Sequence, residues 1–195
     1  MTNAHKLLLE IKSCTICLDQ LPLGPRPILQ ASDSAKILIA GQAPGKRVHQ
    51  SGVPFDDQSG DRLRNWLGMT KEQFYDAGIV AILPMGFCYP GSGKSGDAPP
   101  RPECAKEWRE RLLNVLPHLE LTLLIGKYAI DYHLAGVQKD NLTNTVKAWR
   151  DYWPSKIPMP HPSPRNNIWF RQNPWFEKEV LPVVKQRVRI ITQNN

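Results

Sequence analysis

The chain has 195 residues, 41% of them hydrophobic, which suffices for one compact domain over residues 1–195 but falls short of two ordinary domains. The excess of 25 Lys and Arg over 18 Asp and Glu gives a net charge of +7, which suits a nucleic-acid partner, although many basic proteins bind none. No stretch approaches the roughly 20 apolar residues of a membrane span, and the N-terminus lacks a signal-peptide run. We therefore expect a cytoplasmic monomer without a membrane segment.

Short apolar runs and segments of helical spacing alternate along the chain. The runs predict β-strands at residues 36–40, 79–83, 121–125 and 157–160. The helical spacing predicts helices at 61–67, 102–116, 127–134 and 174–188. This alternation favours a three-layer α/β/α fold with a four-stranded, mostly parallel central sheet. Ligands of such sheets bind at the carboxyl ends of the strands, where the loops leave the sheet.

Residues 41–45, with the sequence Gly-Gln-Ala-Pro-Gly, follow the first predicted strand. Two glycines and a proline suit a tight turn whose backbone approaches a ligand closely, although a purely structural turn would have the same composition. The loop continues through a dense run of polar, glycine and aromatic residues that includes Pro54 and Phe55. We expect this loop to form one wall of a ligand site.

Residues 161–166, His-Pro-Ser-Pro-Arg-Asn, follow the fourth predicted strand. The loops at 41–45 and 161–166 together resemble the two motifs of the uracil-DNA glycosylase superfamily, and the second is most similar to its single-strand-selective branch. The resemblance implies a pocket for a base flipped out of DNA. In it Gly41 and Ala43 would contact the base and Phe55 would stack on it, whereas Phe55 as an ordinary core residue is the alternative.

The resemblance also assigns roles to the second loop. His161 would donate a hydrogen bond to the departing base and so stabilise its developing negative charge. Arg165 and Asn166, with Ser163 and Pro164 before them, would contact DNA. The alternative for these polar residues is an ordinary solvated surface.

The first loop departs from the superfamily pattern at the catalytic position. The chain also resembles families 4 and 5 of the superfamily, and family 4 has an acidic residue where Gln42 stands. A carboxamide can orient water but cannot accept a proton from it. Family 5 uses an aspartate after the phenylalanine, which matches Asp57 best and Asp56 second. Either aspartate could instead cap the helix that follows.

Two other positions have alternative roles. The superfamily's asparagine after the second strand, which reads the uracil edge, falls at Pro84 or Met85. The resemblance therefore places Pro84 and Met85 among the base-binding residues, but neither side chain offers the carboxamide that selects uracil. His49 matches a histidine of family 5, which implies a catalytic or phosphate contact, while a solvated loop histidine is the alternative.

The four cysteines are Cys14, Cys17, Cys88 and Cys104. In a cytoplasmic protein they are metal ligands or free thiols rather than disulfide partners, and four thiolates can hold either zinc or an iron–sulfur cube. Families 4 and 5 resemble this spacing and carry a [4Fe-4S] cluster, so we expect that cluster, with zinc as the alternative. Base hydrolysis needs no redox step, so its role would be structural.

The sequence therefore predicts a DNA repair glycosylase that hydrolyses the N-glycosidic bond of a flipped deaminated base, with uracil as the leading candidate. The second hypothesis is a catalytically weak or inactive relative that binds damaged or single-stranded DNA through the same pocket. A metal-containing RNA- or nucleotide-binding protein is the third.

Overall fold

The computed structural model describes residues 2–93 and 96–193, whose strands form a four-stranded parallel sheet in the order β2-β1-β5-β6. The strands are β1 (Ile37–Ala40), β2 (Val80–Ile82), β5 (Leu121–Ile125) and β6 (Lys156–Met159). Ile37 lies opposite both Val80 and Leu121, and Thr122 lies opposite Lys156. All four strands expected from the sequence are confirmed, with ends that differ by at most one residue.

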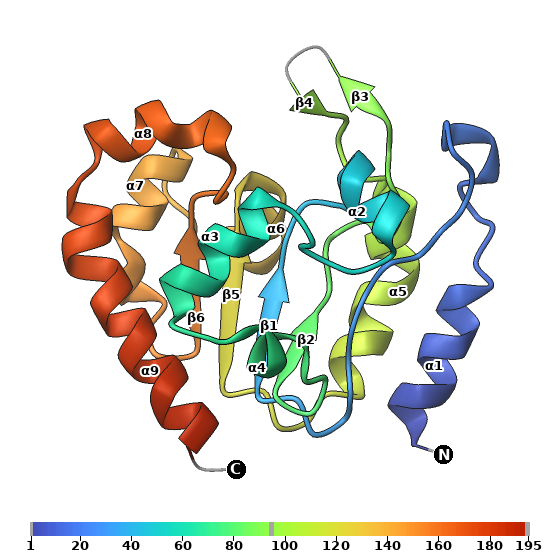
Figure 1. Cartoon of the computed structure of the whole chain (residues 1–195), viewed down its shortest axis with the longest axis horizontal. Helices are drawn as coiled ribbons and strands as arrows, with labels where there is room; N and C mark the ends of the chain where they lie inside the picture. The colour runs from blue at the N-terminus through green and yellow to red at the C-terminus, as the bar shows by residue number, and fades with distance from the viewer. Residues whose placement is uncertain (1, 94–95, 194–195) are drawn as a thin grey trace.

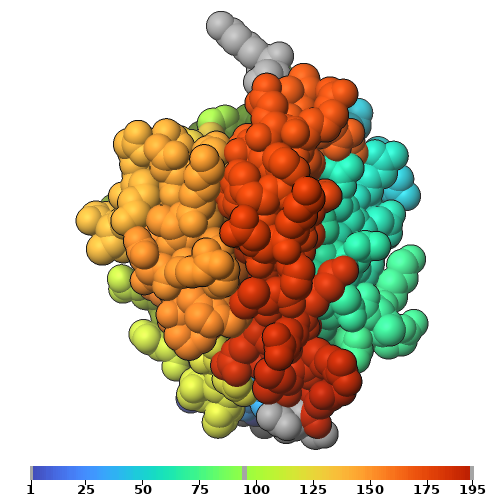
Figure 2. Space-filling model, turned by 90° about the vertical axis from the view of Figure 1, so that its left-hand side faces the viewer, coloured from blue at the N-terminus to red at the C-terminus, as the bar shows by residue number. Residues whose placement is uncertain are grey.

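Helices cover both faces of this sheet (Figure 1). The helices on one face are α1 (Asn3–Lys12), α5 (Pro102–Asn114) and α6 (Lys127–His133). Those on the other face are α3 (Gln58–Leu67), α4 (Lys71–Tyr75), α7 (Leu142–Lys147), α8 (Asn167–Gln172) and α9 (Leu181–Gln193). The fold is therefore the expected three-layer α/β/α arrangement. Figure 2 shows the C-terminal segment as a red band between the teal α3 region and the orange α7 region.

The two hydrophobic cores arise because side chains alternate between the faces of a strand. Ile37 and Ile39 of β1 pack with Leu63 of α3, whereas Leu38 packs with Ile11 of α1 and the α5 side chains. All four residues of β1 are fully buried, as the unbroken apolar run predicted.

Several helix boundaries differ from the sequence prediction. The helix expected at 61–67 begins at Gln58, because the Asp57 side chain accepts a hydrogen bond from the Gly60 N–H and caps it. The helix expected at 174–188 is a π-helical segment, Phe176–Val180, followed by α9. The short helices on either side of the sheet, together with α1, were not predicted, because such segments gain stability from tertiary packing rather than from sequence propensity.

The loops at the carboxyl ends of the strands carry two further elements. Helix α2 (Lys46–Ser51) follows the turn after β1, and a hairpin formed by β3 (Ser92–Gly93) and β4 (Gly96–Asp97) follows β2. Figure 1 shows the hairpin projecting from this end of the sheet. Over residues 2–93 and 96–193, no helix is long and apolar enough to cross a membrane.

Candidate active site

A cavity of about 700 Å³ opens at the carboxyl ends of the strands. The loops after β1, β2 and β6 all contribute to its wall, as the sheet topology predicted. The predicted site residues that line it are Gly41, Gln42, Ala43, Phe55, Asp57, Pro84, His161, Ser163, Pro164, Arg165 and Asn166. The structure thus brings together residues up to 125 positions apart in the chain.

Phe55 forms an apolar wall of the cavity in an unusual backbone conformation. Its φ of 56° lies in the left-handed region, which is costly for a bulky side chain. Its ring lies over Gly41, where an added Cβ would be 3.5 Å from the ring, and meets Phe74 edge to face at 6.2 Å. Phe55 therefore contacts the core with one part of its ring and faces the cavity with another.

Neighbouring residues hold Phe55 in this conformation. A Cβ on Gly60 would lie 1.7 Å from the Phe55 carbonyl oxygen, so only glycine fits there. The buried Arg64 donates to the same carbonyl at 3.5 Å and to the Tyr75 hydroxyl at 3.1 Å. Strained residues that are fixed by their surroundings are concentrated at ligand sites.

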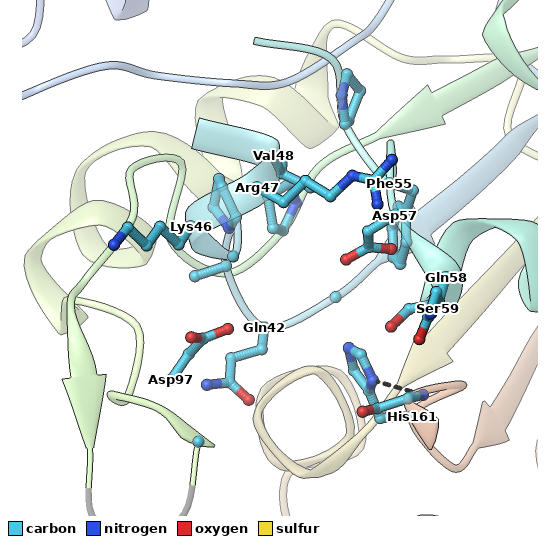
Figure 3. A pocket seen from close by; sticks show the side chains of 18 of the residues that line it. Gln42, Lys46, Arg47, Val48, Phe55, Asp57, Gln58, Ser59, Asp97 and His161 are labelled. Carbon is cyan, nitrogen blue, oxygen red and sulfur yellow. Dashed lines mark hydrogen bonds between the residues drawn. The ribbon is translucent and has the colours of Figure 1, made fainter. Parts of the chain in front are cut away.

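Asp57 both caps α3 and faces the cavity (Figure 3). Its Oδ1 accepts a hydrogen bond from the Gly60 N–H at 2.9 Å. The capping role that the sequence left as an alternative is therefore present, and it occupies only one carboxylate oxygen. Oδ2 forms no hydrogen bond within the described residues and remains available to a ligand.

His161 projects from the loop after β6 into the cavity (Figure 3). Its Nδ1 accepts a hydrogen bond from the Ser163 N–H at 3.2 Å, so in the neutral ring the proton is on Nε2. Burial lowers the pKa of His161, the Asp57 carboxylate raises it, and Arg165 lowers it. The net shift is downward, which favours a neutral imidazole that donates through Nε2.

Gln42 is also fixed in orientation. Its Nε2 donates to the Ala98 carbonyl at 3.0 Å, which leaves Oε1 as an acceptor. This hydrogen bond joins the turn after β1 to the segment after the hairpin.

A model of the Uracil DNA glycosylase superfamily matches residues 29–185, which include every lining residue of the cavity except Ile28. The chain belongs to this superfamily. The superfamily acts on DNA as glycosylases, so the cavity formed by the loops after β1, β2 and β6 is its candidate base pocket.

Sequence reasoning missed several residues that line this pocket. Lys46 and Arg47 of α2 lie exposed at its rim, and they form no ion pair within the part of the chain described. Two basic residues directly after the Gly-Gln-Ala-Pro-Gly turn could have indicated them. Asp97 and Tyr128 also line the pocket, but no motif marks either residue.

Three residues expected at the site lie elsewhere. His49 is on the inner side of α2, with 8% of its surface exposed, and its ring lies 6.0 Å from that of Tyr89. Burial and Arg26 lower its pKa, which favours a neutral ring packed inside α2. Met85 is buried behind the pocket because its N–H donates to the Gly41 carbonyl and its side chain packs on α6. Asp56 is outside the cavity lining.

The four cysteines line one small apolar cavity between the N-terminal segment and the start of α5. None forms a disulfide. The backbone N–H of Arg26 donates to Cys88 Sγ at 3.3 Å, and that of Phe87 donates to Cys104 Sγ at 3.4 Å. Burial raises the pKa of Cys88 to about 11 and that of Cys104 to about 12. These thiols are therefore neutral unless a bound cation stabilises the thiolates.

Over residues 2–93 and 96–193, no three His, Cys, Asp or Glu side chains are close enough to hold one metal ion. A single zinc ion with Zn–S bonds of about 2.3 Å would need sulfurs within about 3.8 Å of one another. The donor set of four thiols in an apolar pocket, two of them receiving N–H donors, is the chemistry that an iron–sulfur cluster uses.

Proposed function

We propose that this protein hydrolyses the N-glycosidic bond of a deaminated base, with uracil as the main substrate, after the base has been extruded from DNA. The observation that carries the proposal is the convergence of Phe55, Asp57 and His161 on one cavity of about 700 Å³. These side chains provide a stacking surface, an anionic group and a neutral hydrogen-bond donor. An extruded base is held by such stacking and edge contacts.

The reaction breaks the bond between the sugar C1′ and the base nitrogen, and the bonding electrons leave with the base. His161 Nε2–H donates to the pyrimidine O2, where the negative charge develops. Asp57 Oδ2 faces the sugar, stabilises its positive charge and accepts a proton from the water that attacks C1′. Gln42 Oε1 helps to orient this water. Each of these groups has the free atom that its step requires.

The rim of the pocket provides contacts for the DNA backbone. Lys46, Arg47 and Arg165 line the cavity, and Arg62 lies beside it with Nη1 donating to the Ser163 carbonyl at 3.4 Å. These cations would bind the phosphates that flank an extruded nucleotide, so affinity should fall steeply with salt. Ser163, Pro164 and Asn166 complete this side of the rim.

A catalytically weak DNA-binding protein is the second candidate function. Gln42 provides no carboxylate at the position after β1, and Pro84 has no side-chain hydrogen-bonding group. Under this alternative the basic rim and Phe55 would still bind extruded bases, while the Asp57→Ala substitution would not change base release.

We also propose that Cys14, Cys17, Cys88 and Cys104 hold a [4Fe-4S] cluster, as in the iron–sulfur families that the sequence resembles. The shared apolar cavity and the N–H donors to sulfur support this assignment, with zinc as the alternative. The cluster would contribute structure only, by tying the N-terminal segment to the loop after β2 and to α5.

The test of the glycosylase proposal is base release from oligonucleotides that contain uracil, hypoxanthine or xanthine, in single- and double-stranded form, followed by alkaline cleavage of the abasic product. We expect release of uracil by the wild type and strongly reduced release by Asp57→Asn and His161→Gln. The absence of abasic product from every lesion, with DNA affinity retained, would favour the binding function instead.

A further inference from the structure

Asp97 is a second carboxylate in the base pocket, and the proposed chemistry does not use it. It ends strand β4 and lines the same cavity as Asp57. Figure 3 shows the two carboxylates on opposite sides of the cavity, with Asp97 beside Gln42. A base stacked on Phe55 would therefore lie between Asp57 and Asp97.

The hairpin that carries Asp97 is fixed to the pocket wall. Gln42 Nε2 donates to the Ala98 carbonyl at 3.0 Å, and the Ala98 N–H donates to the Gly91 carbonyl at 2.8 Å. Gly45 leaves room for the carboxylate, because a Cβ there would be 3.2 Å from Asp97 Oδ2. The carboxylate thus has a defined position against the turn after β1.

The Asp97 carboxylate has no partner of its own within the described residues, since it accepts no hydrogen bond and forms no ion pair there. Partial burial raises the pKa of Asp97, Arg165 lowers it and Asp57 raises it. A partly desolvated anion close to the DNA phosphates weakens binding unless a ligand donates hydrogen bonds to it. A ligand with N–H donors at this point would offset that cost.

We propose that Asp97 determines base specificity by accepting a hydrogen bond from the ring N–H that deamination creates. This inference rests on the proposed glycosylase function. Cytosine N3 and adenine N1 are acceptors, whereas uracil N3 and hypoxanthine N1 carry a hydrogen. A carboxylate accepts from uracil and hypoxanthine and repels the ring-nitrogen lone pair of cytosine and adenine, the bases from which they arise. Pro84, which lines the same pocket, has no side-chain group that could perform this selection.

The experiment compares release of uracil with release of N3-methyluracil, which lacks the ring N–H, from otherwise identical oligonucleotides. Wild type, Asp97→Ala and Asp97→Asn are measured, with Asp33→Ala, a half-buried carboxylate before β1 that does not line the pocket, as the control. We expect Asp97→Ala to lower kcat/KM for uracil on the order of 10- to 100-fold and to leave N3-methyluracil almost unchanged. Asp97→Asn, which keeps an acceptor, should retain more of the preference than Asp97→Ala.

A uracil to N3-methyluracil ratio that is the same in Asp97→Ala and wild type would overturn the assignment while leaving the glycosylase function intact. A binding measurement tests the assignment if the glycosylase function itself fails. If the wild type releases no base, affinity is measured for an oligonucleotide with 2′-fluoro-deoxyuridine, whose glycosidic bond resists cleavage, and for one with a tetrahydrofuran abasic site. Weaker binding of only the uracil oligonucleotide by Asp97→Ala would support base reading by Asp97, and equal binding of both would refute it.

Discussion

We expect the buried pair of Arg109 and His133 to make the stability of this protein sensitive to acid. Arg109 of α5 is fully buried and donates to the Leu83 carbonyl at 2.5 Å and to His133 Nε2 at 2.6 Å. A guanidinium has no acceptor, so His133 Nε2 must be unprotonated. Burial, Arg109 and Lys156 together lower the pKa of His133 to about 3.

The direction and size of the effect follow from this shift. The pKa of His133 in the folded state lies below its unfolded value of about 6.5. At a pH between these two pKa values the unfolded chain binds a proton at His133 and the folded protein does not. His133 therefore contributes full stability above pH 6.5 and loses it as the pH falls toward 3, at about 1.4 kcal/mol per pH unit. Between pH 7.5 and 4.5 the loss from this residue amounts to about 2.7 kcal/mol.

The measurement is urea unfolding followed by tryptophan fluorescence at pH 7.5, 6.0 and 4.5. The His133→Gln variant keeps an acceptor for Arg109 but does not titrate, so its free energy of unfolding should fall less on acidification, by about 2.7 kcal/mol. His118→Gln, at an exposed turn position, is the matched control and should follow the wild type. A His133→Gln variant with the same pH dependence as the wild type would refute the reasoning.

Three further predictions concern the pocket and the cysteines. Asp57→Asn should retain the free energy of unfolding, because asparagine caps helices as well as aspartate, but lower kcat for base release on the order of 100-fold; unchanged kcat would mean that Asp57 only caps α3. Gly60→Ala should destabilise the fold by about 3 kcal/mol and abolish base binding, because its Cβ would meet the Phe55 carbonyl at 1.7 Å. The control is Gly136→Ala, because Gly136 has open space around it and the substitution costs only about 1 kcal/mol of backbone strain. If urea unfolding shows the same loss of unfolding free energy for both variants, this account is contradicted. Cys104→Ser should remove bound iron, the broad absorption near ~400 nm and part of the thermal stability, whereas iron-free, colourless wild-type protein would exclude the cluster.

Much of the fold could be read from the sequence because it depends on local pattern. Strand β1 is apolar throughout and is buried on both faces, so neither a surface strand nor a helix of ordinary length fits residues 36–40. The alternation of such runs with helical segments favours a parallel sheet. In such a sheet the loops that begin at Gly41 and His161 both lie at the carboxyl ends of the strands, so the sequence predicts that they meet there.

The orientation of individual side chains depended on contacts that are remote in sequence. His49 and Asp57 follow the same strand, yet His49 packs inside α2 whereas Asp57 faces the pocket, because the turn at Phe55 is fixed by Gly60 and Arg64. The position of Asp97 in the pocket could not be predicted from the sequence. It depends on a hydrogen bond from Gln42 to a residue 56 positions away, Ala98, which holds the hairpin against the pocket. Motifs therefore determined which loops form the site, while long-range packing decided which of their side chains can reach a base.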